Sequence, residues 1–352
     1  MRRWIAGGLL LSLMGCLAAQ QEPKSVIDFE SEDHGWFVLP LADGKVERTS
    51  NPNDVKRGKY ALMYTYTAAQ GKLNAIIHLE PESWAQGFRF WIKTDRPTML
   101  LFVVSEEGGE RWQAPFWSGL NEWQQVTLAL SDFTLMDDSQ PQNGKLDMDR
   151  AEGIGFMDAG AFLFAVPEAA LLFGEMRGTR MLWLDDFEFL SKAPPRKPSQ
   201  DTLDDFQRDY LMWFATQGVR IKPEAGGMLV EYKQQFPWVL GVGRPLPKRI
   251  LADTKGLVIT LQVKNETTLA VVLEEEGGER WMASRSVGGE DKPETLRLEW
   301  SAFSLTDDTK GKGDGQLTPA RVNLLALVDM GVITGDAQPV NRWIVRMVKL
   351  ER

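Results

Sequence analysis

Short runs in which apolar and polar residues alternate recur along most of the chain, and turn-forming residues separate them. Between Trp123 and Leu130, for example, Val126 and Leu128 alternate with more polar neighbours, so both occupy one face of an extended strand. Comparable apolar runs cover residues 61–66, 75–79, 87–92, 100–104, 153–157 and 182–189. No long segment has the period of an amphipathic helix, so the pattern predicts an all-β protein of antiparallel β-sandwiches.

One heptapeptide, Glu-Glu-Gly-Gly-Glu-Arg-Trp, occurs twice, at Glu106–Trp112 and at Glu275–Trp281. Each copy follows an apolar run, which is the pattern of a β-hairpin whose turn lies at the two glycines. Glycine tolerates the positive φ angles of a tight primed turn, so we expect such a turn in both copies.

The rest of the chain repeats in the same order. Leu203–Phe206 corresponds to Ile27–Phe29, and Leu296–Phe303 corresponds to Val126–Phe133. A repeat of this length indicates a duplicated domain rather than a short solenoid unit. We therefore expect a first β-sandwich over residues 25–191, a proline-rich linker over 192–202 and a second β-sandwich over 203–352.

Residues 1–19 have the features of a signal peptide, because Arg2 and Arg3 precede an apolar stretch too short to cross a bilayer. Two processing routes are open. Cys16 lies in a sequence that resembles a lipobox and would then be lipidated, whereas residues 17–19 suit ordinary signal peptidase. Either route predicts an exported protein, which would be periplasmic, an outer-membrane lipoprotein or extracellular. Its only membrane attachment would be the N-terminal lipid anchor.

Composition excludes several functional classes. The net charge of −9 and the absence of Lys/Arg runs argue against a nucleic-acid partner. Cys16 is the only cysteine, and His34 and His78 are the only histidines, so cysteine catalysis, histidine zinc sites and Ser-His-Asp triads lack their residues. Acidic residues are plentiful, but nothing marks the carboxylate pair of a glycosidase. We expect a non-catalytic protein.

A family resemblance follows from the order of motifs in each repeat. Asp-Phe-Glu at Asp28–Glu30, Gly-Trp at Gly35–Trp36, the motif ending in Ser-Asp-Phe at Phe133 and Trp-Leu-Asp-Asp-Phe at Trp183–Phe187 resemble galactose-binding-like β-sandwiches. The resemblance is to the carbohydrate-binding-module and complex I intermediate-associated branches, and it implies two jelly-roll-type sandwiches in tandem. Such domains often bind carbohydrate on a concave sheet face or by end loops, while others assemble proteins. We therefore expect a carbohydrate or polysaccharide ligand or, as the alternative, an envelope protein as partner.

Four tryptophans are candidates for stacking on a sugar ring. Trp112 and Trp281 occupy equivalent positions after the hairpin, which also suits a role in the core. Trp117 has no aromatic counterpart, since Ser286 takes its place, and Trp84 lies in a polar stretch. Non-repeated aromatics of this kind are expected at the surface.

Asp185 is predicted to share one strand face with Trp183, Phe187 and Phe189, and a carboxylate among aromatics needs a partner. The resemblance implies a structural calcium at the matching position of related modules, with Asp28 and Glu30 as the nearby oxygen ligands. The alternative is a buried Asp that is hydrogen-bonded or paired with an arginine. Val345 replaces Asp185 in the second repeat, so a calcium site is expected only in the first.

Two further segments complete the expectations. The acidic pairs Asp137–Asp138 and Asp307–Asp308 lack the full spacing of a calcium-binding loop and are expected in solvated turns. The apolar segment Ala161–Phe173 has no counterpart in the second repeat, and we expect it to pack within the protein.

Overall fold

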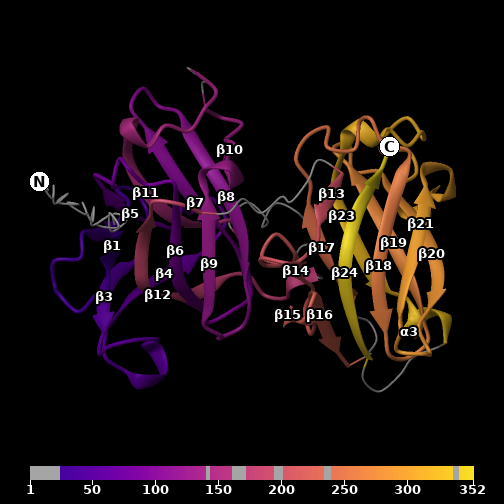
Figure 1. Ribbon diagram of the computed structural model, residues 1–352, viewed down its shortest axis with the longest axis horizontal. Helices are drawn as coiled ribbons and strands as arrows, with labels where there is room; N and C mark the ends of the chain where they lie inside the picture. Colours follow the sequence, from indigo (N-terminus) through magenta and orange to yellow (C-terminus); the bar gives the residue numbers. More distant parts are fainter. Residues whose placement is uncertain (1–23, 140–142, 161–171, 194–200, 234–238, 336–340) are drawn as a thin grey trace, which may run out of the picture.

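The computed structural model describes residues 24–139, 143–160, 172–193, 201–233, 239–335 and 341–352. Over these residues the protein consists of four antiparallel six-stranded sheets, arranged as two units side by side (Figure 1). The longest α-helix among them is the single turn α3 (Gly331–Thr334). The predicted all-β fold of two tandem sandwiches is confirmed.

The first unit pairs a sheet of order β3-β4-β12-β6-β9, in which β1 also pairs with β12, with a sheet of order β10-β8-β7-β11-β5-β2. The first sheet comprises β1 (Lys24–Ile27), β3 (Lys45–Thr49), β4 (Ala61–Ala68), β6 (Gly87–Thr94), β9 (Gln124–Ala129) and β12 (Gly178–Leu190). The second comprises β2 (Trp36–Val38), β5 (Ala75–Leu79), β7 (Thr98–Glu106), β8 (Arg111–Ser118), β10 (Thr134–Leu135) and β11 (Ala151–Asp158). Short 3₁₀ turns lie at Pro52–Asp54, Leu130–Asp132 and Met148–Arg150.

The second unit has the same strand order, β15-β16-β24-β18-β21 with β13 on β24, and β22-β20-β19-β23-β17-β14. Its first sheet comprises β13 (Thr202–Asp204), β15 (Arg220–Glu224), β16 (Gly227–Tyr232), β18 (Gly256–Val263), β21 (Pro293–Glu299) and β24 (Asn341–Glu351). Its second comprises β14 (Phe214–Ala215), β17 (Leu240–Pro245), β19 (Thr267–Glu275), β20 (Arg280–Val287), β22 (Ser304–Leu305) and β23 (Val322–Asp329). Its 3₁₀ turns lie at Trp300–Ala302, Asp307–Thr309 and Pro319–Arg321.

The two cores are built from different side chains, although the strand orders of the two units match. Inward positions of the first unit are mainly aromatic, and the Phe90 and Phe187 rings stack with centroids 5.7 Å apart. Inward positions of the second are mainly aliphatic, such as Leu261, Val271 and Leu327, all at most 1% exposed. Both sets follow from strand alternation, because every second side chain points between the sheets.

Both duplicated hairpins form, but the predicted two-residue primed turn is wrong. The backbone N–H of Glu106 donates to the carbonyl of Glu110, and the equivalent bond joins Glu275 to Glu279. Three residues therefore separate the paired glutamates. This is a three-residue hairpin loop, which typically ends in a glycine of positive φ. Gly108 and Gly109 have positive φ in the first copy, whereas only Gly278 does in the second.

A buried aspartate ties the strands together at one end of each sandwich. Asp158 accepts hydrogen bonds from the Tyr66 hydroxyl at 2.8 Å, the Thr98 hydroxyl at 2.7 Å and Arg180 Nη1 at 2.9 Å. Asp329 repeats the arrangement with Tyr232 and Thr267, but an asparagine, Asn341, stands where the first unit has Arg180. Burial raises the pKa of both tyrosines, so each stays a hydrogen-bond donor.

The different third partner leads to a prediction. Tyr232→Phe should destabilise the protein more than Tyr66→Phe, and removing a hydrogen bond to a buried charge typically costs about 1.5–3 kcal/mol. After Tyr66→Phe, Arg180 still compensates the Asp158 oxygen that loses its donor. After Tyr232→Phe, the corresponding Asp329 oxygen keeps the 3.4 Å contact with the Asn341 amide. Thermal unfolding of both variants measures the difference, and a larger loss for Tyr66→Phe would contradict it.

Candidate functional site

The two sandwiches meet at the end of β8, where Trp117 enters the core of the second unit. Its backbone N–H donates to the carbonyl of Leu211 at 2.7 Å, and its ring centroid lies 6.2 Å from that of Phe214. Phe173 completes the aromatic contact, with its centroid 5.9 Å from Trp117 and 5.2 Å from Phe214. Trp117 is 3% exposed and packs with the second unit's core residues.

A cleft of about 530 Å³ opens between the units near this contact, and we call it the junction cleft. Its size lies within the usual range of small-molecule sites, about 300–1,000 Å³. Apolar and charged side chains from both units line it: Gln113, Pro115, Ser131, Asp132, Thr134, Leu135, Asp137, Leu203, Asp204, Asp205, Arg208, Asp209, Met212, Arg244, Pro245, Leu246, Pro247 and Lys248. Another cleft, of about 780 Å³, borders Trp117 itself.

Arg208 of the second unit holds the junction cleft together from one side. Its Nη2 lies 3.0 Å from Asp132 Oδ2 of the first unit and also donates to the carbonyl of Thr127. Its Nε lies 3.4 Å from Asp209. The Asp132 side chain is 4% exposed, and its Oδ2 also accepts from Ala129 N at 2.8 Å, so Arg208 supplies the positive charge that a buried carboxylate at the boundary between the units needs.

The acidic wall of the cleft comes from the start of the second unit. Asp204 Oδ2 accepts a hydrogen bond from Trp213 Nε1 at 3.0 Å, and Arg244 Nε lies 3.7 Å away. Burial raises the pKa of Asp204 above its usual range. Asp205 uses one oxygen to accept from the backbone of Gln207, and across the cleft Lys248 bridges to Asp137 at 3.0 Å.

This arrangement suits a neutral ligand rich in hydroxyl groups. Carboxylates such as Asp205 and Asp209 accept hydrogen bonds from hydroxyls, and Gln113 both donates and accepts. Leu135 and Met212 offer apolar contact beside them. Because acceptors of both units border one cavity, the complete set exists only when the two sandwiches are docked.

Three of the four candidate tryptophans are buried, which fits the core role weighed for Trp112 and Trp281, whereas the expected exposure of Trp117 is wrong. Trp112 and Trp281 are each 7% exposed and belong to the cores of their own units, so neither presents a ring face to solvent. Trp117 was expected at the surface because it has no aromatic counterpart. That asymmetry instead reflects the junction, since only the first unit inserts the end of this strand into its neighbour.

Trp84 stays a prediction, but it lies outside the junction cleft. Its side chain is half-buried against the first core, and its Nε1 donates to Glu82 at 2.9 Å. The four tryptophans are therefore not brought together in one site.

The predicted calcium residues surround one turn without forming a group of three ligands. Glu30 Oε1 accepts from the backbone of Lys59 and Tyr60, and Asp185 Oδ2 accepts from that of Lys56 and Arg57. Asp28 instead accepts from the backbone of Glu30. No set of three or more Asp, Glu, His or Cys is placed to hold a metal among the residues the structure describes.

Asp185 therefore has the hydrogen-bonded, buried environment that was the alternative to a calcium ligand. Burial raises its pKa to about 6. Glu30 lies so close to Gly58 that a Cβ there would come within 2.2 Å of Oε1. A calcium ion at Glu30 and Asp185 stays a prediction.

Several other expectations also stay predictions. Cys16, the signal segment, most of the linker and residues 161–171 of the apolar insertion lie outside the described residues.

Of the acidic pairs, Asp137 borders the junction cleft and Asp138 pairs with Arg111 at 2.7 Å. Asp307 and Asp308 pair with Lys310 and Arg280 at the surface.

Sequence reasoning missed Asp132, Arg208 and the acidic residues at the start of the second unit as site residues. Asp132 and Asp204 were noted only as parts of repeated motifs. Their shared site forms between repeats, and a comparison of one repeat with the other carries no signal for it.

Comparison with known proteins agrees with the observed fold. Residues 18–162 match the family model "Carbohydrate binding domain (family 11)". The match covers most of the first β-sandwich, and the second repeats its strand order.

Several solved structures are similar to the chain. They include the family 11 carbohydrate-binding module of cellulosomal cellulase Lic26A-Cel5E of Clostridium thermocellum, at 14% identity and TM-score 0.36, which covers 50% of this chain and 99% of the module. The tandem CBM22-1-CBM22-2 domain of Xyn10C from Paenibacillus barcinonensis has 13% identity and TM-score 0.31, with 95% and 98% of the two chains covered. A comparison with curated protein sequences gives no match.

Among the residues that the structure describes, no helix is long and apolar enough to cross a membrane.

The contact between Arg208 and Asp132 leads to a prediction about the junction. Arg208→Met should lower the stability of the chain by about 3–5 kcal/mol, the usual effect of removing one partner of a buried ion pair. Arg220→Met is the matched control, because Arg220 pairs with Glu122 across the same junction while both side chains are largely exposed. The control should cost about 0–1 kcal/mol. Equal effects in thermal unfolding would contradict the assignment.

Proposed function

We propose that the chain is a non-catalytic, exported binding protein that holds a carbohydrate in the junction cleft between its two galactose-binding-like sandwiches. The family 11 match supports carbohydrate as the ligand class for the first unit. Export rests on the sequence of residues 1–19. The observation that carries the location is the cleft itself, where hydroxyl-binding side chains and apolar side chains of both units converge.

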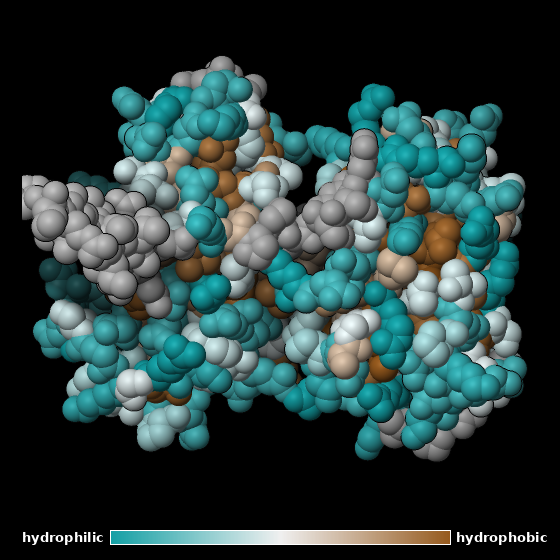
Figure 2. All heavy atoms as spheres, viewed as in Figure 1, coloured by the Kyte–Doolittle hydropathy of each residue, from teal (hydrophilic) through white to brown (hydrophobic). Residues whose placement is uncertain are grey.

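The outer face of the second sheet of the first unit is a less suitable carbohydrate surface. Its outward positions on β7 include Leu101 and Val103, which are aliphatic and half-buried. Sugar-binding faces commonly use flat aromatic rings, whose faces contact the C–H groups of a pyranose. Figure 2 shows apolar side chains gathered on both units amid hydrophilic ones.

A protein partner is the second candidate, and the same apolar face is what favours it. Phe37 on β2 and Leu79 on β5 are 38% and 50% exposed, and these strands are neighbours in the sheet. Exposed apolar side chains that adjoin one another are typical of protein-binding surfaces. The two candidates thus use different parts of the first unit, and one variant in each part separates them.

Gln113→Ala should weaken carbohydrate binding about fivefold, because one hydrogen bond contributes about 1 kcal/mol. A glycan array with the full chain first identifies the ligand, and calorimetry then measures Kd for the variants. Gln125→Ala, which removes an exposed glutamine of β9 in the other sheet, is the control and should bind normally.

Two results would count against this location. Unchanged affinity in Gln113→Ala together with a loss in Phe37→Ala would move the site to the outer sheet face. No binding to any glycan, with capture of a defined envelope protein that Phe37→Ala abolishes, would favour the second candidate.

A further inference from the structure

The loop between β3 and β4 carries three cations, Lys56, Arg57 and Lys59, and we call residues 56–60 the basic segment. All three cationic residues are exposed. The second unit has no such loop, because only residues 225–226 separate β15 from β16. The sandwich fold therefore does not require this segment. In Figure 1 the loop after β3 lies on the side of the first unit that faces away from the second.

Two carboxylates hold the backbone of the basic segment in place. Asp185 Oδ2 accepts from its first two N–H groups at 2.8 and 2.9 Å, and Glu30 Oε1 accepts from its last two at 2.7 and 3.0 Å. Gly58 lies between these anchors with a φ of 68°, and a Cβ there would come within 2.2 Å of Glu30 Oε1. The cationic side chains thus start from a fixed backbone, which lowers the entropy lost when they bind a ligand.

Aromatic rings, and not carboxylates, lie beside the two lysine ammonium groups. Lys56 Nζ is 4.2 Å from the ring centroid of Trp91, and Lys59 Nζ is 5.1 Å from that of Tyr60. Arg57 Cζ is 5.9 Å from the Trp91 centroid. Among the residues that the structure describes, neither ammonium group makes an ion pair with a carboxylate. A ring face attracts a cation without neutralising its charge, so both charges remain available to an anion.

The carboxylates around the basic segment are less exposed than its cations or already engaged. Asp185 is 0% exposed, and the Asp186 side chain is 15% exposed, whereas its partner Arg57 at 3.0 Å is 58% exposed. Glu30 is at the surface, but its Oε1 is used by the backbone of the segment. Glu32 is 92% exposed and pairs with an arginine of β3 at 3.2 Å. The outermost charges of the segment itself are therefore positive.

We propose that the basic segment binds an anionic polysaccharide, whose carboxylate or sulfate groups pair with Lys56, Arg57 and Lys59. Arg57 uses Nη1 on Asp186, and a guanidinium has further N–H groups that fit planar oxyanions. Trp91 beside them offers apolar contact to a sugar ring. None of these residues lines the junction cleft, so this is a second site.

A sparsely charged glycan fits the basic segment better than a nucleic acid does. Duplex DNA carries one charge about every 1.7 Å, whereas an acidic polysaccharide carries about one per sugar ring. Three cations on a chain of net charge −9 match the lower density. The choice of a glycan also rests on the proposed function, although the location does not.

The experiment is calorimetric titration of the full chain with polygalacturonate, with its methyl-esterified form as the uncharged polymer and dextran sulfate to distinguish sulfate from carboxylate. The chain should bind at least one acidic polymer and not the methyl ester. Lys56→Gln and Lys59→Gln should each weaken binding about threefold, and together about tenfold, as expected of exposed charge pairs. The control is Lys292→Gln with Lys310→Gln, which removes the same charge from exposed lysines of the second unit and should bind normally.

Thermal unfolding of every variant should show an unchanged fold, because all four lysines are exposed. Gln113→Ala, which tests the junction cleft, should leave binding of the acidic polymers unchanged, so either site can fail without the other. Binding of neither acidic polymer, equal binding of the methyl ester, or equal weakening in the control would overturn the proposal. Tighter binding of duplex DNA or of anionic phospholipid vesicles than of both acidic polymers would also overturn it.

Discussion

The burial of Trp117 in the neighbouring sandwich is the contact on which the proposed site depends. A tryptophan side chain is a large apolar surface, and burying it in a foreign core joins two domains that a proline-rich linker alone would leave independent. Phe173 and Phe214 enclose the ring, and Arg208 secures the boundary nearby by pairing with Asp132. With the sandwiches docked in this way, side chains from both border one cleft.

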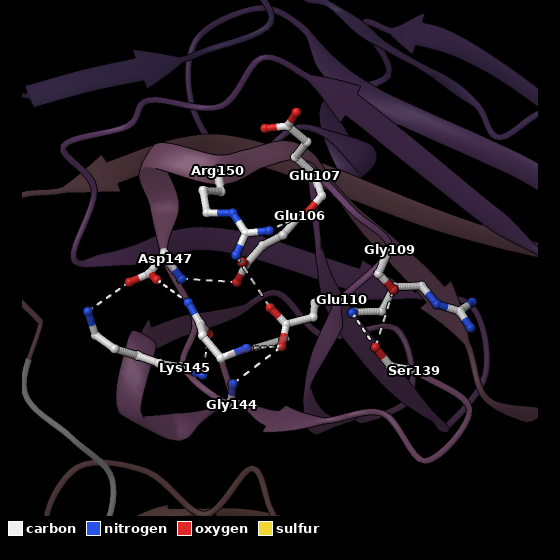
Figure 3. Close-up of polar contacts among 11 residues, drawn as sticks. Glu106, Glu107, Gly109, Glu110, Ser139, Gly144, Lys145, Asp147 and Arg150 are labelled. Atoms are coloured by element: carbon white, nitrogen blue, oxygen red, sulfur yellow. Dashed lines mark hydrogen bonds and ion pairs between the residues drawn. The ribbon is translucent and has the colours of Figure 1, made fainter. Parts of the chain in front are cut away.

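Buried carboxylates are the second recurring feature, and the duplication shows what they do. Asp158 and Asp329 fasten strands at one end of each sandwich, whereas the hairpin glutamates fasten loops by their backbone amides. A carboxylate inside a sandwich is costly, so each one must be fully compensated. For the aspartates, hydroxyl, guanidinium or amide donors supply that compensation. For the glutamates, loop backbone amides and a nearby arginine supply it, as Figure 3 shows for the first unit.

The sequence contained enough information for the fold but less for the site. Alternation within strands and the exact repetition of the hairpin motif predicted two sandwiches, because both features reflect the inward and outward faces of one sheet. The turn type was mispredicted because two adjacent glycines fit both a two-residue and a three-residue loop. The Glu106–Glu110 bond decides between them, and it depends on strand register.

The site was missed because its residues become neighbours only when the repeats dock. Comparing repeats marked Trp117 as unusual, which was correct, but exposure was the wrong explanation. Ser286, its counterpart in the second unit, is exposed, since no third sandwich covers that strand end among the described residues. Trp112 and Trp281 were ambiguous because they are repeated. A tryptophan present in both copies of a duplicated domain fits a core position and a duplicated ligand-binding position equally well.

The central claim is that the two sandwiches form one docked unit rather than two tethered domains. Pulsed electron resonance between spin labels at Gln125→Cys and Glu299→Cys, in a Cys16→Ser background, measures this most directly, because both positions are exposed and lie in different units. The account predicts one narrow distance distribution, which Trp117→Ala broadens. A broad distribution in the chain with Trp117 intact would contradict it.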